Sequence, residues 1–253
     1  MADLRVNKGS NKKQHRHESV TAIKALPNEL LVEIIAKVAS RSIVDLCKVK
    51  LCCKEFLHAA EDDNVYHHAS MEKFALVPLP WFTGEKESSF LKRCRENGNS
   101  EISYREGMVQ YFSSLRVKSG LENLKNAAME GLDEAKYVYC MLLMCSEDEG
   151  ERKRGFDLYC TLKRSTCVRR CRKRVKSFIR SMWVNNKIVV RNHKLSLCST
   201  CDGERLKKLS RRWSSLVEDE DGDGISCEYC SADYELGLFC NMKSNYLRNQ
   251  ACE

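Results

Sequence analysis

Proline, glycine and long apolar runs are all scarce in this chain of 253 residues. Only 3 prolines and 12 glycines occur, too few for a low-complexity or loop-dominated protein, and their scarcity favours helices. The longest apolar stretch, residues 137–145, is far shorter than the roughly 20 residues that a membrane-spanning helix needs. Residues 1–18 lack the apolar segment of a signal peptide. We therefore expect a helical, intracellular protein that does not enter a membrane.

Acidic residues are outnumbered, because 35 aspartates and glutamates face 43 lysines and arginines and leave a net charge of +8. An excess of this size does not by itself indicate nucleic-acid binding, since its position along the chain matters more. Cysteine, in contrast, is abundant, with 15 residues. Because an intracellular compartment keeps thiols reduced, we interpret most cysteines as small buried apolar residues and a subset as metal ligands.

Residues 1–22 show no apolar periodicity, and we expect a disordered tail there. The next segment, residues 23–70, carries helix signals. Pro27 suits a first helical turn, where its missing N–H is not needed. Leu30, Ile34 and Val38 recur every four residues, which predicts a helix with one broad apolar stripe.

Polar residues support this first helix and indicate where the second begins. Glu33 and Lys37 have the spacing of a favourable i,i+4 ion pair on the solvent side. Ser42 can cap the second helix, whose apolar residues continue past Val49. Phe56 fits either the end of that helix or a third short one.

Two motifs in this segment resemble an F-box. Residues 26–34, Leu-Pro-Asn-Glu-Leu-Leu-Val-Glu-Ile, are similar to the opening of the family pattern. Residues 52–56, Cys-Cys-Lys-Glu-Phe, are similar to its later Val-Cys-Lys-x-Trp segment, with cysteine and phenylalanine at the first and last positions. The resemblance implies a three-helix module that binds a Skp-type adaptor, and through it a cullin.

A module of under ~50 residues buries too little surface to be robust alone, so apolar side chains left exposed would mark its partner interface. The Leu26–Pro27 pair is the part that we most expect to be exposed; other positions contribute to an internal core. The adaptor contacts that the resemblance implies are Leu26, Pro27, Leu30, Leu31, Ile34, Asp45, Leu46, Val49, Cys53 and Phe56.

Residues 71–99 contain prolines at 78 and 80 and no helical period, so we expect an extended connector. Residues 100–185 are helical again, and three pairs of similar positions are 35 residues apart: Tyr104 and Tyr139, Gly120 and Gly155, Leu124 and Tyr159. This period is typical of helix–turn–helix repeats, although two ordinary helical hairpins would also explain it. The small residues that would let these helices approach closely are Ala127, Ala128, Gly131 and Ala135. The region is similar to the Sel-like repeats of a plant group of F-box proteins.

A basic run over residues 163–180 has its apolar positions three to four residues apart, at Val168, Cys171, Val175 and Ile179. It predicts an amphipathic helix with a solvated basic face. Binding to an acidic partner or nuclear import ranks second as an explanation. Nucleic-acid binding ranks last, because no aromatic residues interleave with the charges to stack on bases.

Residues 190–253 are polar, punctuated by cysteine and poor in helical period. Two Cys-x-x-Cys pairs, Cys198 with Cys201 and Cys227 with Cys230, can supply the four thiolates of a structural zinc site. Cys240 and His193 are alternative ligands, and reduced cysteines without metal remain the other interpretation. The resemblance also implies a zinc-binding segment here, since some relatives end in a zinc finger. We interpret the acidic residues 219–223 as a surface loop, because Cys230 stands where a calcium-binding loop would need its closing glutamate.

These patterns predict a mainly α fold with an N-terminal three-helix F-box, a central helical-hairpin repeat region and a small cysteine-rich C-terminal segment. The predicted function is a non-catalytic adaptor that recruits an unknown substrate protein to a Skp-cullin-F-box ubiquitin ligase, in the nucleus or the cytoplasm. The alternative is a zinc-dependent nuclear protein that binds proteins or nucleic acid without a ligase role. Neither a phosphate-binding glycine loop nor a nucleophile elbow is present to indicate an enzyme.

Overall fold

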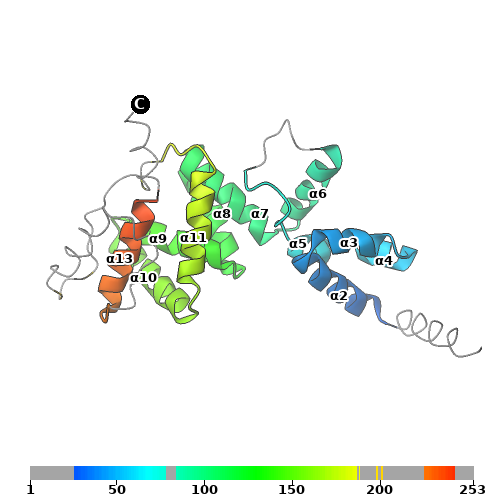
Figure 1. The fold of residues 1–253 in the computed structure, drawn as a ribbon, viewed down its shortest axis with the longest axis horizontal. Coiled ribbons are helices and arrows are strands. Elements are labelled where there is room, and N and C mark those ends of the chain that lie inside the picture. The colour runs from blue at the N-terminus through cyan, green and yellow to red at the C-terminus, as the bar shows by residue number, and fades with distance from the viewer. Residues whose placement is uncertain are drawn as a thin grey trace, which may run out of the picture. The chain divides into compact units, whose positions relative to one another are not determined.

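The computed structural model describes residues 26–77, 84–186, 188, 198, 201 and 225–242. The regular structure within these ranges is helical, which confirms the mainly α prediction. No helix in the described part of the chain has the length and apolarity needed to cross a membrane. The predicted N-terminal tail lies outside the described residues. Figure 1 labels the α-helices. The elements are α2 Asn28–Arg41, α3 Ile43–Lys50, α4 Lys54–Ala59, α5 Asp63–His68, α6 Glu85–Glu96, α7 Ser100–Met108, the π-helical turn η2 Val109–Ser113, α8 Val117–Met129, α9 Asp133–Met144, α10 Glu149–Arg164, α11 Val168–Arg180 and α13 Glu228–Cys240.

The chain divides into two compact units, residues 1–73 and residues 74–253. The first unit contains α2 to α5, so a fourth short helix, α5, follows the three that the motif implies. Ser42 caps α3 by accepting a hydrogen bond from the Asp45 N–H at 3.1 Å, as its position suggested. The expected pair of Glu33 and Lys37 forms at 3.0 Å. The core of this unit is built from Val32, Ile35, Ala36, Ala39, Leu46, Ala59, Ala60, Val65, Tyr66, Ala69 and Met71.

A small polar network ties α3 to α5. Lys50 donates to Glu61 at 2.7 Å and to the Tyr66 hydroxyl at 3.2 Å, and that hydroxyl donates to the second oxygen of Glu61 at 2.7 Å. Burial disfavours the charge on Lys50, but the bonds to Glu61 and Tyr66 outweigh it and raise the pKa of the lysine. The network therefore holds the end of α3 against α5.

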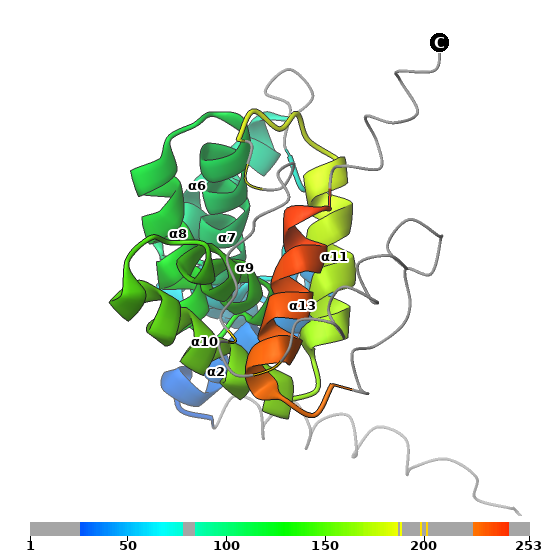
Figure 2. The same cartoon turned by 90° about the vertical axis from the view of Figure 1, so that its left-hand side faces the viewer.

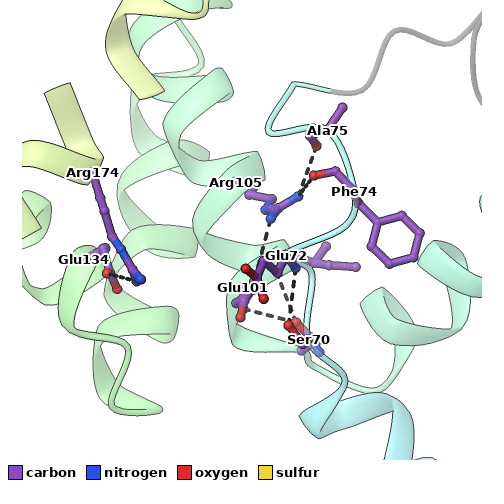
Figure 3. Close-up of polar contacts among 10 residues, drawn as sticks. Ser70, Glu72, Phe74, Ala75, Glu101, Arg105, Glu134 and Arg174 are labelled. Carbon is purple, nitrogen blue, oxygen red and sulfur yellow. Dashed lines mark hydrogen bonds and ion pairs between the residues drawn. The ribbon is translucent and has the colours of Figure 1, made fainter. Parts of the chain in front are cut away.

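The first residues of the second unit are held by hydrogen bonds from α7. Arg105 of α7 donates to the backbone carbonyls of Phe74 and Ala75 at 3.1 and 3.0 Å, as Figure 3 shows. Phe74 stacks on Phe90 of α6, with ring centroids 5.6 Å apart. α6 lies inside the range expected to be an extended connector, so that expectation was too broad. Its helical signal is weak because only Phe90, Leu91 and Cys94 are apolar in twelve residues.

Two helical hairpins, α7–η2–α8 and α9–α10, form the middle of this unit (Figure 1). Gly120 of α8 faces the backbone of Tyr111, and Gly155 of α10 faces the carbonyl of Cys140 in the same way. Leu124 and Tyr159, also 35 residues apart, are both buried. The 35-residue spacing therefore relates residues with equivalent structural roles, namely the glycines at which the second helix of each hairpin crosses the first.

Gly131 has a different role from the one suggested by its small size. Its φ is +91° and no side chain or neighbouring backbone lies near the place of a Cβ atom. The Leu132 N–H donates to the Ala127 carbonyl at 3.1 Å, the bond of a Schellman turn at the C-terminus of α8. Glycine is thus favoured here by backbone conformation and not by close helix packing.

Replacing Gly120 by alanine is expected to destabilise the second unit by about 2–3 kcal/mol. The added Cβ would lie 2.6 Å from the backbone nitrogen of Tyr111, which cannot move away as a side chain tip can. Chemical denaturation of the full chain measures the loss. Gly84→Ala is the matched control, because nothing lies within 4 Å of its Cβ position. Equal stability of the two variants would contradict the proposed close crossing.

α13 is the main addition to what the sequence indicated for the C-terminal segment. Its buried residues include Ala232, Leu236 and Phe239, which belong to the same apolar core as the repeat helices. Phe239 packs against Phe112 and Tyr137, with ring centroids 6.3 and 6.1 Å apart. Figure 2 shows α13 running beside α11. The predicted cysteine-rich segment is therefore partly helical and joined to the repeat unit.

Candidate protein interface and candidate metal centre

A row of apolar side chains is exposed along one face of α2. Leu26, Leu30 and Ile34 are 37%, 47% and 49% exposed, and Leu30 and Ile34 lie one helical turn apart. The opposite face of the helix is buried through Val32 and Ile35. The sequence indicated a single broad stripe, whereas α2 has two apolar faces of which only one is used by the core. Within the first unit, Leu26, Leu30 and Ile34 therefore have no core function, as expected of a docking face.

The other predicted contact residues differ in exposure. Pro27, Asp45 and Cys53 are exposed, and Leu31, Val49 and Phe56 are half-buried. Leu46 is 1% exposed and belongs to the internal core, because it lies on the face of α3 that packs into the unit. A direct partner contact by Leu46 is not compatible with this position.

Three further apolar residues are exposed in the same unit and were not selected from the sequence. They are Val44 of α3, Leu51 at the end of that helix, and Leu57 of α4. Leu51 is 86% exposed. In the sequence these residues are recognisable only as apolar, and apolar character alone does not distinguish a core position from a surface position. We refer to Leu26, Leu30, Ile34, Val44, Leu51 and Leu57 together as the exposed apolar residues of the first unit.

Four cysteines from two separate parts of the second unit converge on one point. The Sγ atoms of Cys198, Cys201, Cys227 and Cys230 all lie within 4.8 Å of one another, and the pair Cys198–Cys227 is 3.9 Å apart. Sulfurs around a tetrahedral zinc ion, at about 2.3 Å each, lie about 3.8 Å apart. The cluster thus matches the size and donor set of a site for one metal ion.

Local structure explains why these thiols meet. Cys227 is the N-cap residue of α13, and Cys230 lies in its first turn. The Cys201 N–H donates to the Cys198 sulfur at 3.4 Å, closing the first Cys-x-x-Cys turn. Asp233 of α13 accepts a hydrogen bond from the Cys198 N–H at 3.1 Å, which holds that turn against the helix.

Two of the four thiols in the cluster, Cys201 and Cys230, have a raised pKa. Burial, followed by hydrogen bonds to the neighbouring thiols, raises the pKa of Cys230. Hydrogen bonds to Cys198 and Cys227 raise the pKa of Cys201. A divalent cation reverses this balance, because it stabilises thiolates and releases their protons on binding.

The remaining sequence candidates lie elsewhere. Cys240, an alternative ligand, is at the other end of α13, where its sulfur is 3.9 Å from that of Cys145. His193 and the acidic stretch 219–223 lie outside the described residues.

The basic helix α11 has the predicted buried stripe, with Cys171, Val175 and Ile179 in the core. Its basic face is exposed as predicted at Arg169, Arg170, Lys173, Arg174 and Arg180, whereas the Arg172 side chain is largely buried. Three of the arginines pair with carboxylates of other helices. Arg170 pairs with Asp133 and Arg174 with Glu134, both at 2.7 Å; Figure 3 shows the second pair. Arg172 binds Glu235 of α13 through two bonds of 2.8 and 2.7 Å. This pairing reduces the positive charge that α11 can offer to a nucleic acid.

Comparison with known proteins matches both units to described families. Residues 23–68 match the F-box domain, and residues 74–180 match plant tetratrico peptide repeats. The second match agrees with the 35-residue period and the helical hairpins. The more specific likeness to Sel-like repeats stays a prediction.

Two proteins of Arabidopsis thaliana are similar over long alignments. The F-box protein At2g35280 is 32% identical over 126 residues, which span 50% of this chain and 76% of the relative. The protein At1g67623, also named for an F-box, is 27% identical over 253 residues, which span 95% of this chain and 82% of the relative. No solved structure matches the chain. From the domain match and the coverage of these relatives, the chain belongs to the plant F-box protein family.

Proposed function

We propose that this protein is a substrate-recruiting subunit of a Skp-cullin-F-box ubiquitin ligase. The observation that carries the proposal is the exposure of Leu30 and Ile34 on α2 and of Leu26 just before it, within the segment that matches the F-box domain. Apolar residues left uncovered in so small a unit favour a stable protein partner over solvent. A Skp-type adaptor is the partner that an F-box implies, and a cullin follows through that adaptor.

The second unit supplies the proposed target-binding part. Helical repeats present extended surfaces for other proteins, and residues 74–180 match such a repeat family. The proposed role is non-catalytic, since the ubiquitin transfer would be carried out by other subunits. Residence in the nucleus or the cytoplasm, where cullin ligases act, is part of the same proposal.

Affinity purification of the tagged full chain from plant cells, followed by mass spectrometry, tests this proposal and identifies candidate targets. We expect a Skp-type adaptor and a cullin to be enriched relative to a Leu26→Ala, Pro27→Ala double variant. Recovery of neither protein, or equal recovery with the double variant, would contradict the proposal. Salt-sensitive binding to nucleic acid, lost on chelation, would instead support the alternative of a zinc-dependent nuclear protein.

We infer that the four-cysteine cluster binds zinc in a structural site. Four cysteine ligands with no open coordination position are typical of structural zinc, and a polar C-terminal segment gains folding energy from such an ion. The purified full chain is expected to contain about one zinc ion, measured by inductively coupled plasma mass spectrometry. A Cys198→Ser, Cys227→Ser variant is expected to lose it, whereas Cys52→Ser, an exposed cysteine outside the cluster, should retain it. Equal zinc content in both variants would contradict the assignment.

A further inference from the structure

Helix α13 belongs to the candidate metal centre and to the core of the repeat unit at the same time. Its N-cap and first turn carry Cys227 and Cys230 of the cysteine cluster. Its later turns bury Leu236 and Phe239 among the repeat helices. Since one rigid helix spans both places, the cluster is not a finger that is independent of the repeats.

A buried polar network fixes the middle of α13. Glu235 is 2% exposed and accepts two hydrogen bonds from Arg172 of α11, at 2.8 and 2.7 Å. Its carboxylate also accepts a bond from the Tyr137 hydroxyl of α9, at 2.7 Å. A buried carboxylate is tolerated only with such partners, so correct placement of α13 and pairing of Arg172 depend on each other.

A second set of contacts joins α13 to α10 near the cysteine cluster. Lys163 donates to the Ser231 hydroxyl at 2.9 Å, and the Tyr159 hydroxyl is hydrogen-bonded to the same oxygen at 3.0 Å. The ring of Tyr229 stacks on Phe156, with centroids 4.2 Å apart and planes inclined by 4°. Ser231 and Tyr229 are sequence neighbours of Cys230, so the turn that carries ligands also carries these contacts.

We propose that α13 is a metal-dependent closing helix of the repeat unit. Ion binding at its first turn and the packing of its later turns against α9, α10 and α11 form one cooperative event. Loss of the ion loosens α13 and uncovers the buried surface around Phe112 and Tyr137. The state of the metal site thereby controls the integrity of the proposed target-binding unit. This inference rests on the proposed zinc site, but not on the adaptor role of the first unit.

Linkage supplies the test, because coupling between two sites is reciprocal. If zinc binding favours the docked α13, a change that weakens docking must lower zinc affinity without touching a ligand. Arg172→Met is expected to weaken zinc binding by the full chain about tenfold or more. The matched control is Arg170→Met on the same helix, whose ion pair with Asp133 of α9 does not involve α13. Its zinc affinity is expected to stay within about twofold of the parent chain. Competition with a chromogenic chelator measures the zinc affinity of the parent chain and of the two variants.

Equal zinc affinity of the Arg172→Met variant and the parent chain would overturn the proposal. Should that variant fail to fold, Glu235→Gln gives the same comparison, because it keeps the shape of the side chain and removes its charge.

Amide hydrogen exchange of the parent chain gives an independent readout. Chelation is expected to raise exchange in α13 and in the facing parts of α9 and α11; exchange confined to residues 198–201 and 225–230 would overturn the coupling. Adaptor binding measured in the same samples reports on the first unit and separates failure of this inference from failure of the proposed function.

Discussion

Leu30→Glu combined with Ile34→Glu is expected to weaken binding of a Skp-type adaptor about a hundredfold or more, while the chain remains folded. Both side chains are about half exposed and lie on the α2 face opposite Val32 and Ile35. Two carboxylates placed in an apolar interface must lose their hydration without a partner, which is costly. Glutamate is also a good helix former, so the change does not disturb α2 itself. Isothermal titration calorimetry with the purified adaptor measures the effect.

Met129→Glu is the control for this experiment. Met129 is 76% exposed and lies on α8 in the second unit, so the same type of change is made away from the exposed apolar residues of the first unit. Adaptor binding of this variant is expected to equal that of the parent chain. Circular dichroism and the unfolding midpoint show whether each variant is folded. Unchanged adaptor binding by a folded Leu30→Glu, Ile34→Glu variant would remove α2 from the interface.

The second large effect is expected at the buried ion pair between α11 and α13. Arg172→Met is expected to reduce the free energy of unfolding of the second unit by about 3–5 kcal/mol. The Arg172 and Glu235 side chains are only 12% and 3% exposed. The substitution therefore leaves a buried carboxylate whose remaining side-chain donor among the described residues is Tyr137. Urea denaturation followed by circular dichroism measures the loss. Arg170→Met, at an exposed pair, is expected to cost no more than about 1 kcal/mol.

The double variant Arg172→Met, Glu235→Leu separates the ion pair from simple packing. Removing both charges avoids the unpaired carboxylate, so the double variant is expected to be more stable than Arg172→Met alone. Its stability relative to the parent chain then gives the net contribution of the pair together with the Tyr137–Glu235 hydrogen bond, which the leucine also removes. The free energy of unfolding is also measured for Glu235→Leu alone. If the loss in the double variant equals the sum of the losses in the two single variants, Arg172 and Glu235 act independently.

Local patterns predicted the helices well where periodicity and capping agreed. The helical conformation of α2, the cap at Ser42 and the inward face of α11 all follow from residues within one or two turns. The 35-residue spacing of Gly120 and Gly155 indicated the hairpins, because glycine was needed at both crossings. The four cysteines could be selected as one set, since two Cys-x-x-Cys pairs already define a ligand pattern.

Features that depend on distant partners could not be predicted in the same way. Leu30, Ile34 and Leu46 are all apolar residues at helical spacing, and only the tertiary arrangement shows that Leu46 is buried and the others exposed. On α11, burial of Arg172 could not be predicted from local pattern, because its partner Glu235 is 63 residues away. α13 itself has buried residues around much of its circumference, so it lacks the one-sided pattern by which helices are recognised.

Size-exclusion chromatography with light scattering, applied to the purified full chain mixed with a purified Skp-type adaptor, tests the central claim most directly. The proposed role as an F-box subunit predicts a stable complex of one chain with one adaptor. Separate elution of the two proteins, with the chain shown to be folded, would contradict it.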